Sequence, residues 1–158
     1  MTTTVSKLDI IILSSGDGQV FRVPEAHARK CITLGHILDD IVVDNAPFPL
    51  PNIRGEVLKL VLEYCKHHTD SPGTEEALSK WNKHFLKKHS QIMLFELIRA
   101  SNYLENKSLL DTTCAALARQ LRGRTTEDMR MALGIENDFT PDQEATIQRE
   151  NEWMEEKQ

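Results

Sequence analysis

The residues best suited to binding a metal lie together at positions 65–68, in Cys65-Lys66-His67-His68. A zinc site needs three or four such ligands converging on one point. Adjacent side chains on a helix point about 100° apart, and no second pair of ligands in the sequence has the spacing of a metal site. The sequence therefore favours a pair of histidines near a helix end, and it predicts no metal ion.

Candidate nucleophiles and phosphate-binding loops are equally weak. Gly16-Asp17-Gly18 precedes a predicted strand rather than a helix, so a hairpin turn explains it better than a phosphate cradle. Cys65 and Cys114 lie on apolar helix faces, where thiols are usually inert. Ser14-Ser15 lacks the elbow motif of hydrolases. We expect no catalytic residue, no cofactor and no enzymatic activity.

Length and composition narrow the class of protein further. The chain has 158 residues, of which 40% are hydrophobic and 27% charged, so we expect one globular domain with an extension. The longest apolar run near the N-terminus, residues 10–13, is too short for a signal peptide or a membrane span. Three widely spaced cysteines suit a reducing, intracellular compartment. The basic cluster at residues 80–88 is too small to indicate nucleic acid.

The C-terminal segment, residues 135–158, predicts a helix that has too few apolar residues to bury itself. Thr140, Pro141 and Gln143 fit an N-cap, a first-turn proline and the partner of a capping box. Ile147, Asn151 and Met154 form only a thin, interrupted stripe, with Trp153 to one side. The segment also holds eight acidic and two basic residues. We interpret it as part of a binding surface; the alternative is a frayed acidic tail.

The first half of the chain mixes strands and helices. Residues 7–13 and 19–23 predict a hairpin joined by the turn at residues 15–18. A short helix should start at Pro24-Glu25, and Thr33 is a candidate cap for a helix over 34–40. Prolines keep residues 47–51 extended, and Asn52 is the candidate cap of a largely buried helix. The composition of residues 69–79 predicts a loop.

The second half of the chain should contain only helices. The helix over 92–104 has a core face, made of Leu94, Leu97, Ile98, Ser101 and Leu104. A separate face carries Phe95, Arg99, Asn102 and Tyr103, so this helix could contact two bodies, although Tyr103 could equally lie on a loop of its own domain. A helix closed by Gly123 follows, and Thr125-Thr126-Glu127-Asp128 predicts the capped start of a short helix ending at Gly134.

Five motifs carry a resemblance to a known family. They are PFPLPNI at 47–53, Trp81 with Phe85-Leu86-Lys87, LFELIRASNYLENKSLLDTTC at 94–114, RGRTTEDMR at 122–130, and IENDFTPDQEATIQRENEW at 135–153. In this order they resemble the Skp family, the S-phase-kinase-associated adaptors of SCF ubiquitin ligases. The related elongin C has a similar first domain but lacks the last two helices, so the C-terminal segment favours Skp.

The resemblance implies an α/β (α+β) fold, with a BTB/POZ domain followed by a C-terminal helical extension. Residues 1–68 would form the N-terminal part of the BTB/POZ domain, 69–79 a variable loop, 80–121 the helices that complete the domain, and 122–158 the F-box-binding extension.

The resemblance also implies two partners and no catalysis by the chain itself. An F-box protein would be held by Leu94, Leu110, Leu117, Leu121, Ile135, Phe139, Ile147, Asn151 and Trp153. A cullin would be held by Asn102 and Tyr103. The implied location is cytoplasmic and nuclear, with self-association possible when no F-box protein is bound and with no nucleic acid or membrane partner.

An alternative function rests on departures from the family pattern. Arg99 stands where an apolar residue is usual, and the stretch at 80–88 is more basic than usual. The alternative is a cullin-independent structural F-box adaptor in a chromatin or centromere assembly.

Overall fold

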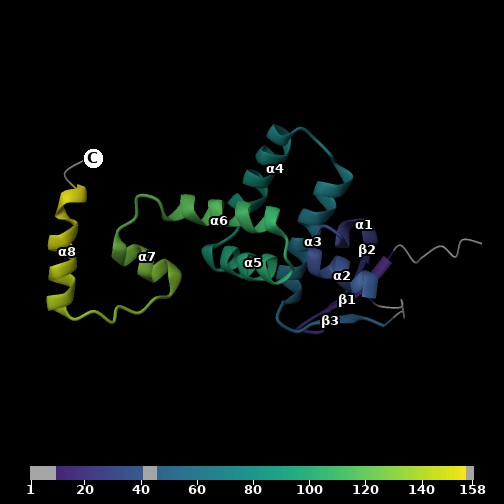
Figure 1. Ribbon diagram of the computed structural model, residues 1–158, viewed down its shortest axis with the longest axis horizontal. Helices are drawn as coiled ribbons and strands as arrows, with labels where there is room; N and C mark the ends of the chain where they lie inside the picture. The colour runs from purple at the N-terminus through teal and green to yellow at the C-terminus, as the bar shows by residue number, and fades with distance from the viewer. Residues whose placement is uncertain (1–9, 41–45, 156–158) are drawn as a thin grey trace, which may run out of the picture. The chain divides into compact units, whose positions relative to one another are not determined.

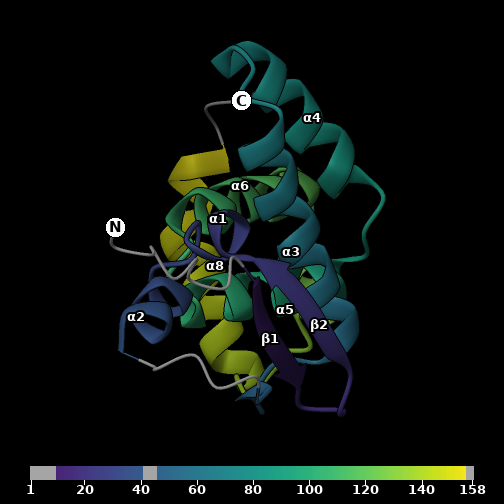
Figure 2. The ribbon, with the colours of Figure 1, turned by 90° about the vertical axis from the view of Figure 1, so that its right-hand side faces the viewer.

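The computed structural model describes residues 10–40 and 46–155, and the chain divides into two compact units, Met1–Arg122 and Gly123–Gln158. A three-stranded sheet lies in the N-terminal unit, with strands β1 (Ile10–Ser15), β2 (Val20–Pro24) and β3 (Phe48–Leu50) in the order β2-β1-β3. β1 pairs antiparallel with β2, as the predicted hairpin requires (Figure 2), and parallel with β3. The extended stretch at 47–51 therefore supplies the third strand.

Six helices of the N-terminal unit are described: α1 (Glu25–Ala28), α2 (Ile32–Asp40), α3 (Gly55–Asp70), α4 (Glu75–Lys87), α5 (Gln91–Tyr103) and α6 (Lys107–Leu121). α5 and α6 pack against each other, and α3 packs against α5 (Figure 1). The core between them contains fully buried leucines from strand and helices, among them Leu13, Leu34, Leu58 and Leu97. None of the described helices is both long enough and apolar enough to cross a membrane.

The start of α3 differs from the sequence prediction, which placed a cap at Asn52. α3 begins at Gly55, and the Gly55 amide donates to the Asp17 carboxylate at 2.8 Å. Hydrogen bonds from the Ser15 hydroxyl and then the Gly55 amide hold the pKa of the Asp17 carboxyl below its usual value. A Cβ at Gly16 would lie 2.3 Å from the Pro51 carbonyl oxygen, so glycine is needed for this close approach. The hairpin turn, rather than a local residue, thus completes the helix N-terminus.

The predicted start of α2 and the predicted bounds of the loop at 69–79 were also wrong. α2 begins at Ile32, so Thr33 lies inside the helix instead of capping it, and its hydroxyl donates to the Tyr103 carbonyl at 3.2 Å. The predicted loop at 69–79 is shorter, because α3 continues to Asp70 and α4 begins at Glu75. The Thr74 hydroxyl accepts the Ala77 amide at 3.3 Å, and two glutamates occupy the first turn, so a strong N-terminal signal starts α4 early.

The histidine pair of the 65–68 segment belongs to an aromatic stack between α3 and α4. The His67 ring stacks on Trp81 with centroids 3.8 Å apart, and Trp81 stacks on Phe85 at 4.7 Å. His68 stacks on Tyr64 at 4.0 Å, and its Nε2 lies 2.8 Å from Asn82 Oδ1. Within the described ranges, no group of three or more Cys, His, Asp or Glu residues could hold a metal ion. The pair therefore joins two helices.

Stability should fall as the pH drops below about 6.5, because burial lowers the pKa of His68 and of His89. The unfolded chain binds protons at these histidines before the folded chain does, so acidification favours unfolding until the folded pKa values are passed. Urea unfolding midpoints measured from pH 7.5 to 5 check this. The variant His68→Gln with His89→Gln should flatten that part of the profile; an unchanged slope would assign the loss to other groups.

The turn between α5 and α6 holds a residue in the left-handed region. Glu105 has φ 54°, and the Asn106 amide donates to the Ser101 carbonyl at 2.9 Å, which is the pattern of a helix closed by a left-handed residue. Asn106 Oδ1 then accepts the Leu109 amide at 3.1 Å and caps α6. Glycine adopts this conformation without the cost that a Cβ brings.

We expect Glu105→Gly to raise the free energy of unfolding by about 1 kcal/mol, since it removes the left-handed strain. Urea denaturation at pH 7 measures the change. Glu105→Ala is the matched control, because it removes the same carboxylate and keeps the Cβ. If alanine stabilised the chain as much as glycine, the gain would come from the lost charge instead of the backbone.

Candidate functional site

The C-terminal unit is built on two capped helices, α7 (Thr126–Leu133) and α8 (Pro141–Glu155). The Thr125 hydroxyl accepts the Asp128 amide at 3.1 Å, and α7 ends at Gly134, with φ 63°. Both signals were predicted. At the start of α8, the Gln143 amide donates to the Thr140 hydroxyl at 3.3 Å, and the Thr140 amide donates to Gln143 Oε1 at 2.9 Å. This reciprocal pair confirms the predicted capping box.

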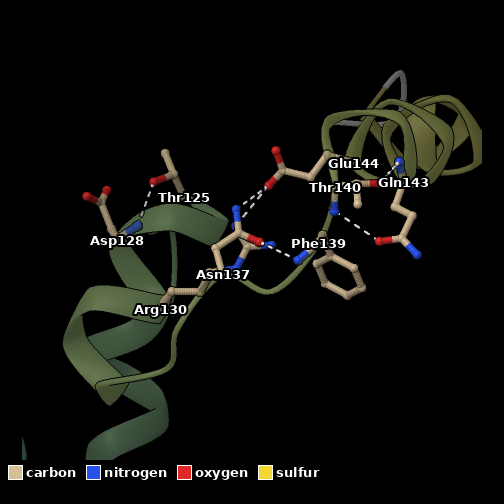
Figure 3. A network of polar contacts seen from close by, with 8 residues as sticks. All are labelled: Thr125, Asp128, Arg130, Asn137, Phe139, Thr140, Gln143 and Glu144. Carbon is tan, nitrogen blue, oxygen red and sulfur yellow. Dashed lines mark hydrogen bonds and ion pairs between the residues drawn. The ribbon is translucent and has the colours of Figure 1, made fainter.

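One carboxylate joins α7, the connecting segment and α8 (Figure 3). Glu144 Oε1 lies 3.2 Å from Arg130 Nη1 and accepts from Asn137 Nδ2 at 2.7 Å. Asn137 Oδ1 in turn accepts the Phe139 amide at 3.2 Å. The Arg130 guanidinium lies 5.8 Å from the centroid of the Phe139 ring, within cation–π range. A network of charged groups fixes geometry better than a single surface ion pair, so it holds Phe139 at a defined place.

Arg130, Phe139 and Glu144 border an open groove of about 620 Å³ within the C-terminal unit. The groove is lined by Thr125, Thr126, Glu127, Arg130, Phe139, Glu144, Ile147, Gln148 and Asn151. Three of them, Phe139, Ile147 and Asn151, come from the set that the sequence assigned to the F-box interface. Arg130 and Glu144 were not singled out, because their pairing depends on how the segment between α7 and α8 turns.

The apolar side chains of this unit remain in water. Phe139 is 46% exposed, Ile147 38%, Ile135 56% and Trp153 64%. Isolated exposed hydrophobic residues are common. Here, however, Met131 and Met154 are exposed as well, and two of the exposed side chains, Phe139 and Ile147, line the groove, which indicates a surface that another polypeptide covers.

The remaining predicted F-box contacts lie in the N-terminal unit, and their accessibility differs. Leu110 and Leu121 are partly exposed on α6. Leu117 is 8% exposed, and Leu94 is fully buried in the core. A side chain without exposed surface has no area to offer a partner, so Leu94 can act only by supporting α5 from inside.

The predicted cullin face lies at the C-terminal end of α5. Asn102 is exposed and Tyr103 is 43% exposed, so both offer surface to a partner. The core face of the same helix buries Leu94, Leu97 and Ser101, as the periodicity predicts. Arg99 is also exposed and lies 3.6 Å from Glu96, so this departure from the family pattern does not disturb the core.

The two units define a class of protein: an α+β domain of the BTB/POZ type with a helical extension that carries an open groove with exposed apolar side chains. Models of two domains of the Skp1 family match the chain, the tetramerisation domain over residues 9–70 and the dimerisation domain over residues 107–154. The chain belongs to the Skp1 family.

Curated relatives match nearly end to end. SKP1-like protein 9 of Arabidopsis thaliana is 46% identical over 147 residues, which is 90% of this chain and 95% of the relative. The SCF ubiquitin ligase complex protein SKP1b of Dictyostelium discoideum is 38% identical over 160 residues, 95% of this chain and 98% of the relative. Suppressor of kinetochore protein 1 of Schizosaccharomyces pombe is 39% identical over 165 residues, 97% of this chain and 100% of the relative.

Proposed function

We propose that this chain is the adaptor subunit of an SCF ubiquitin ligase, which joins F-box substrate receptors to a cullin scaffold. The observation that carries the proposal is the groove between α7 and α8, whose apolar side chains are exposed in the free chain. Membership of the Skp1 family supports it, as does the relative whose name places it in an SCF ubiquitin ligase complex.

The F-box protein would bind the C-terminal unit together with the exposed parts of α6. Phe139 and Ile147 offer apolar area in the groove, and Asn151 offers a side-chain amide for hydrogen bonds. Trp153 adds a large aromatic surface on α8, the helix that also carries Ile147 and Asn151. Apolar anchors surrounded by polar and charged groups are the usual composition of a specific interface.

The cullin would bind the end of α5 through Asn102 and Tyr103. A chain with two separate faces then accelerates ubiquitin transfer by proximity alone, because it raises the effective concentration of the substrate near the charged enzyme. The proposal assigns no catalytic residue, cofactor or metal to this chain. We also propose that the chain is located in both cytoplasm and nucleus. The free chain would self-associate while the groove is uncovered.

Affinity purification of the chain from its native cell tests the proposal. We expect an F-box protein and a cullin to co-purify with the chain in stoichiometric amounts. F-box proteins without any cullin would instead favour the structural adaptor of a chromatin or centromere assembly. Absence of both would overturn the proposed function.

A further inference from the structure

Two buried thiols that are far apart in the sequence meet in the core of the N-terminal unit. Cys31, which directly precedes α2, and Cys65, on α3, are fully buried, and their sulfur atoms lie 3.8 Å apart. The third cysteine, Cys114, is exposed. The function proposed above uses neither buried thiol.

A polar side chain completes this cluster. Asn106 Nδ2 lies 3.5 Å from Cys65 Sγ and 3.8 Å from Cys31 Sγ. The orientation of the amide is fixed, because Asn106 Oδ1 accepts the Leu109 amide at the start of α6 and the NH₂ group must therefore point at the sulfurs. The two thiols thus share a hydrogen-bond donor.

The contact between the two sulfurs lets one thiol donate a hydrogen bond to a thiolate at the other. The Cys65 thiol and the Asn106 amide both stabilise a thiolate at Cys31 and lower its pKa, against the opposing effect of burial. The hydrogen bond with Cys31 and burial both raise the pKa of the Cys65 thiol. One sulfur is suited to attack an oxidant, and its neighbour is suited to trap the product.

We propose that Cys31 and Cys65 form a redox-modification site, at which a hydroperoxide converts the dithiol into an intramolecular disulfide. The Cys31 thiolate attacks one peroxide oxygen, the O–O bond breaks, and the products are a Cys31 sulfenic acid and hydroxide. The Cys65 sulfur then attacks the Cys31 sulfur, the S–O bond breaks, and the oxygen leaves as water with the Cys65 proton. Overall, two thiols lose two electrons and two protons, and the peroxide is reduced.

Burial selects the oxidant. A hydroperoxide such as H₂O₂ is small enough to reach the pair through local openings of the fold, whereas the tripeptide disulfide of glutathione is not. The sulfurs are already in contact at 3.8 Å and must approach to a bond length of about 2.05 Å. Cys114 is exposed, so bulky reagents such as glutathione disulfide reach its thiol directly.

The cluster is also connected to the surface of the chain. Asn106 caps α6, and Thr33, two residues after Cys31, donates its hydroxyl to the Tyr103 carbonyl. Formation of the disulfide therefore acts on the turn between α5 and α6, beside the residues assigned to the cullin.

A chemical test uses the full chain with Cys114→Ser, which removes the exposed thiol. The reduced protein is treated with H₂O₂, quenched, denatured and alkylated, and then analysed by intact and peptide mass spectrometry. We expect loss of both alkylatable thiols and a peptide cross-link between Cys31 and Cys65. Two thiols that stay alkylatable would overturn the proposal, and so would their separate oxidation to sulfinic acids.

Further variants supply the controls. In the Cys114→Ser background, Cys31→Ser or Cys65→Ser leaves one sulfur, so oxidation should stop at single-thiol products without a cross-link. Asn106→Asp keeps an oxygen to cap α6 but replaces the shared donor with a carboxylate, whose negative charge disfavours a thiolate, so disulfide formation should slow severalfold. An unchanged rate would overturn the part assigned to Asn106. Circular dichroism before treatment verifies that each variant is folded.

Discussion

An F-box protein should bind the Phe139→Ala, Trp153→Ala double variant about a thousandfold more weakly than the unaltered chain. Each ring is an exposed aromatic side chain that offers anchor area, and truncation of an interface anchor costs at least about 2 kcal/mol. Burial of a whole indole can contribute on the order of 4–6 kcal/mol before ordering costs, so the two losses together justify this estimate. Isothermal titration calorimetry with a purified F-box protein measures the change.

The variant should remain folded, because neither ring belongs to the buried core. A matched control is Val20→Ala with Ile32→Ala, which removes two apolar side chains of similar exposure, 58% and 51%, from the N-terminal unit. The control should bind the F-box protein normally. Undiminished binding by the Phe139, Trp153 variant would refute the role of these two side chains in F-box binding.

The second large effect is expected on cullin binding, at the C-terminal end of α5. Asn102→Lys with Tyr103→Lys should weaken cullin binding at least about a hundredfold and leave F-box binding intact, because it removes an aromatic contact and places two charges in a desolvated interface. Lysine is a good helix former, and both original side chains are exposed, so α5 should keep its structure. Pull-down of cullin and F-box protein by the same sample measures both affinities.

A second variant on α5 serves as the control for the added charge. Gln91→Lys with Ile92→Lys adds two charges at the opposite end of α5, where Ile92 is 72% exposed. That variant should retain cullin. If the Asn102, Tyr103 variant lost both partners, the fold would have failed; if it lost neither, the cullin would bind elsewhere.

Signals that act within a few residues were predicted well from the sequence. The hairpin turn, the capping box of Thr140 and Gln143, and the end of α7 at Gly134 all depend on neighbours along the chain. The two faces of α5 follow from helical periodicity alone. Local geometry and side-chain type determine these features, so one sequence is enough to find them.

Features that join distant residues were missed. The amide at the start of α3 is bound by Asp17, which is 38 positions away, so the local candidate Asn52 was wrong. The contact between Cys31 and Cys65 spans 34 positions, and the sequence offered only three separate cysteines. The pairing of Arg130 with Glu144 depends on the turn of an irregular segment. Each needs the tertiary fold, which no periodicity encodes.

The chain has two tryptophans, and they lie in different units and in contrasting surroundings. Trp81 is stacked between His67 and Phe85, whereas Trp153 is 64% exposed to water. Indole emission shifts to longer wavelength in polar solvent, so Trp81→Phe and Trp153→Phe give single-tryptophan proteins with an intrinsic fluorescent reporter for each unit. Partner docking on the extension and melting of the α3–α4 junction thereby become separate optical signals, without any attached dye.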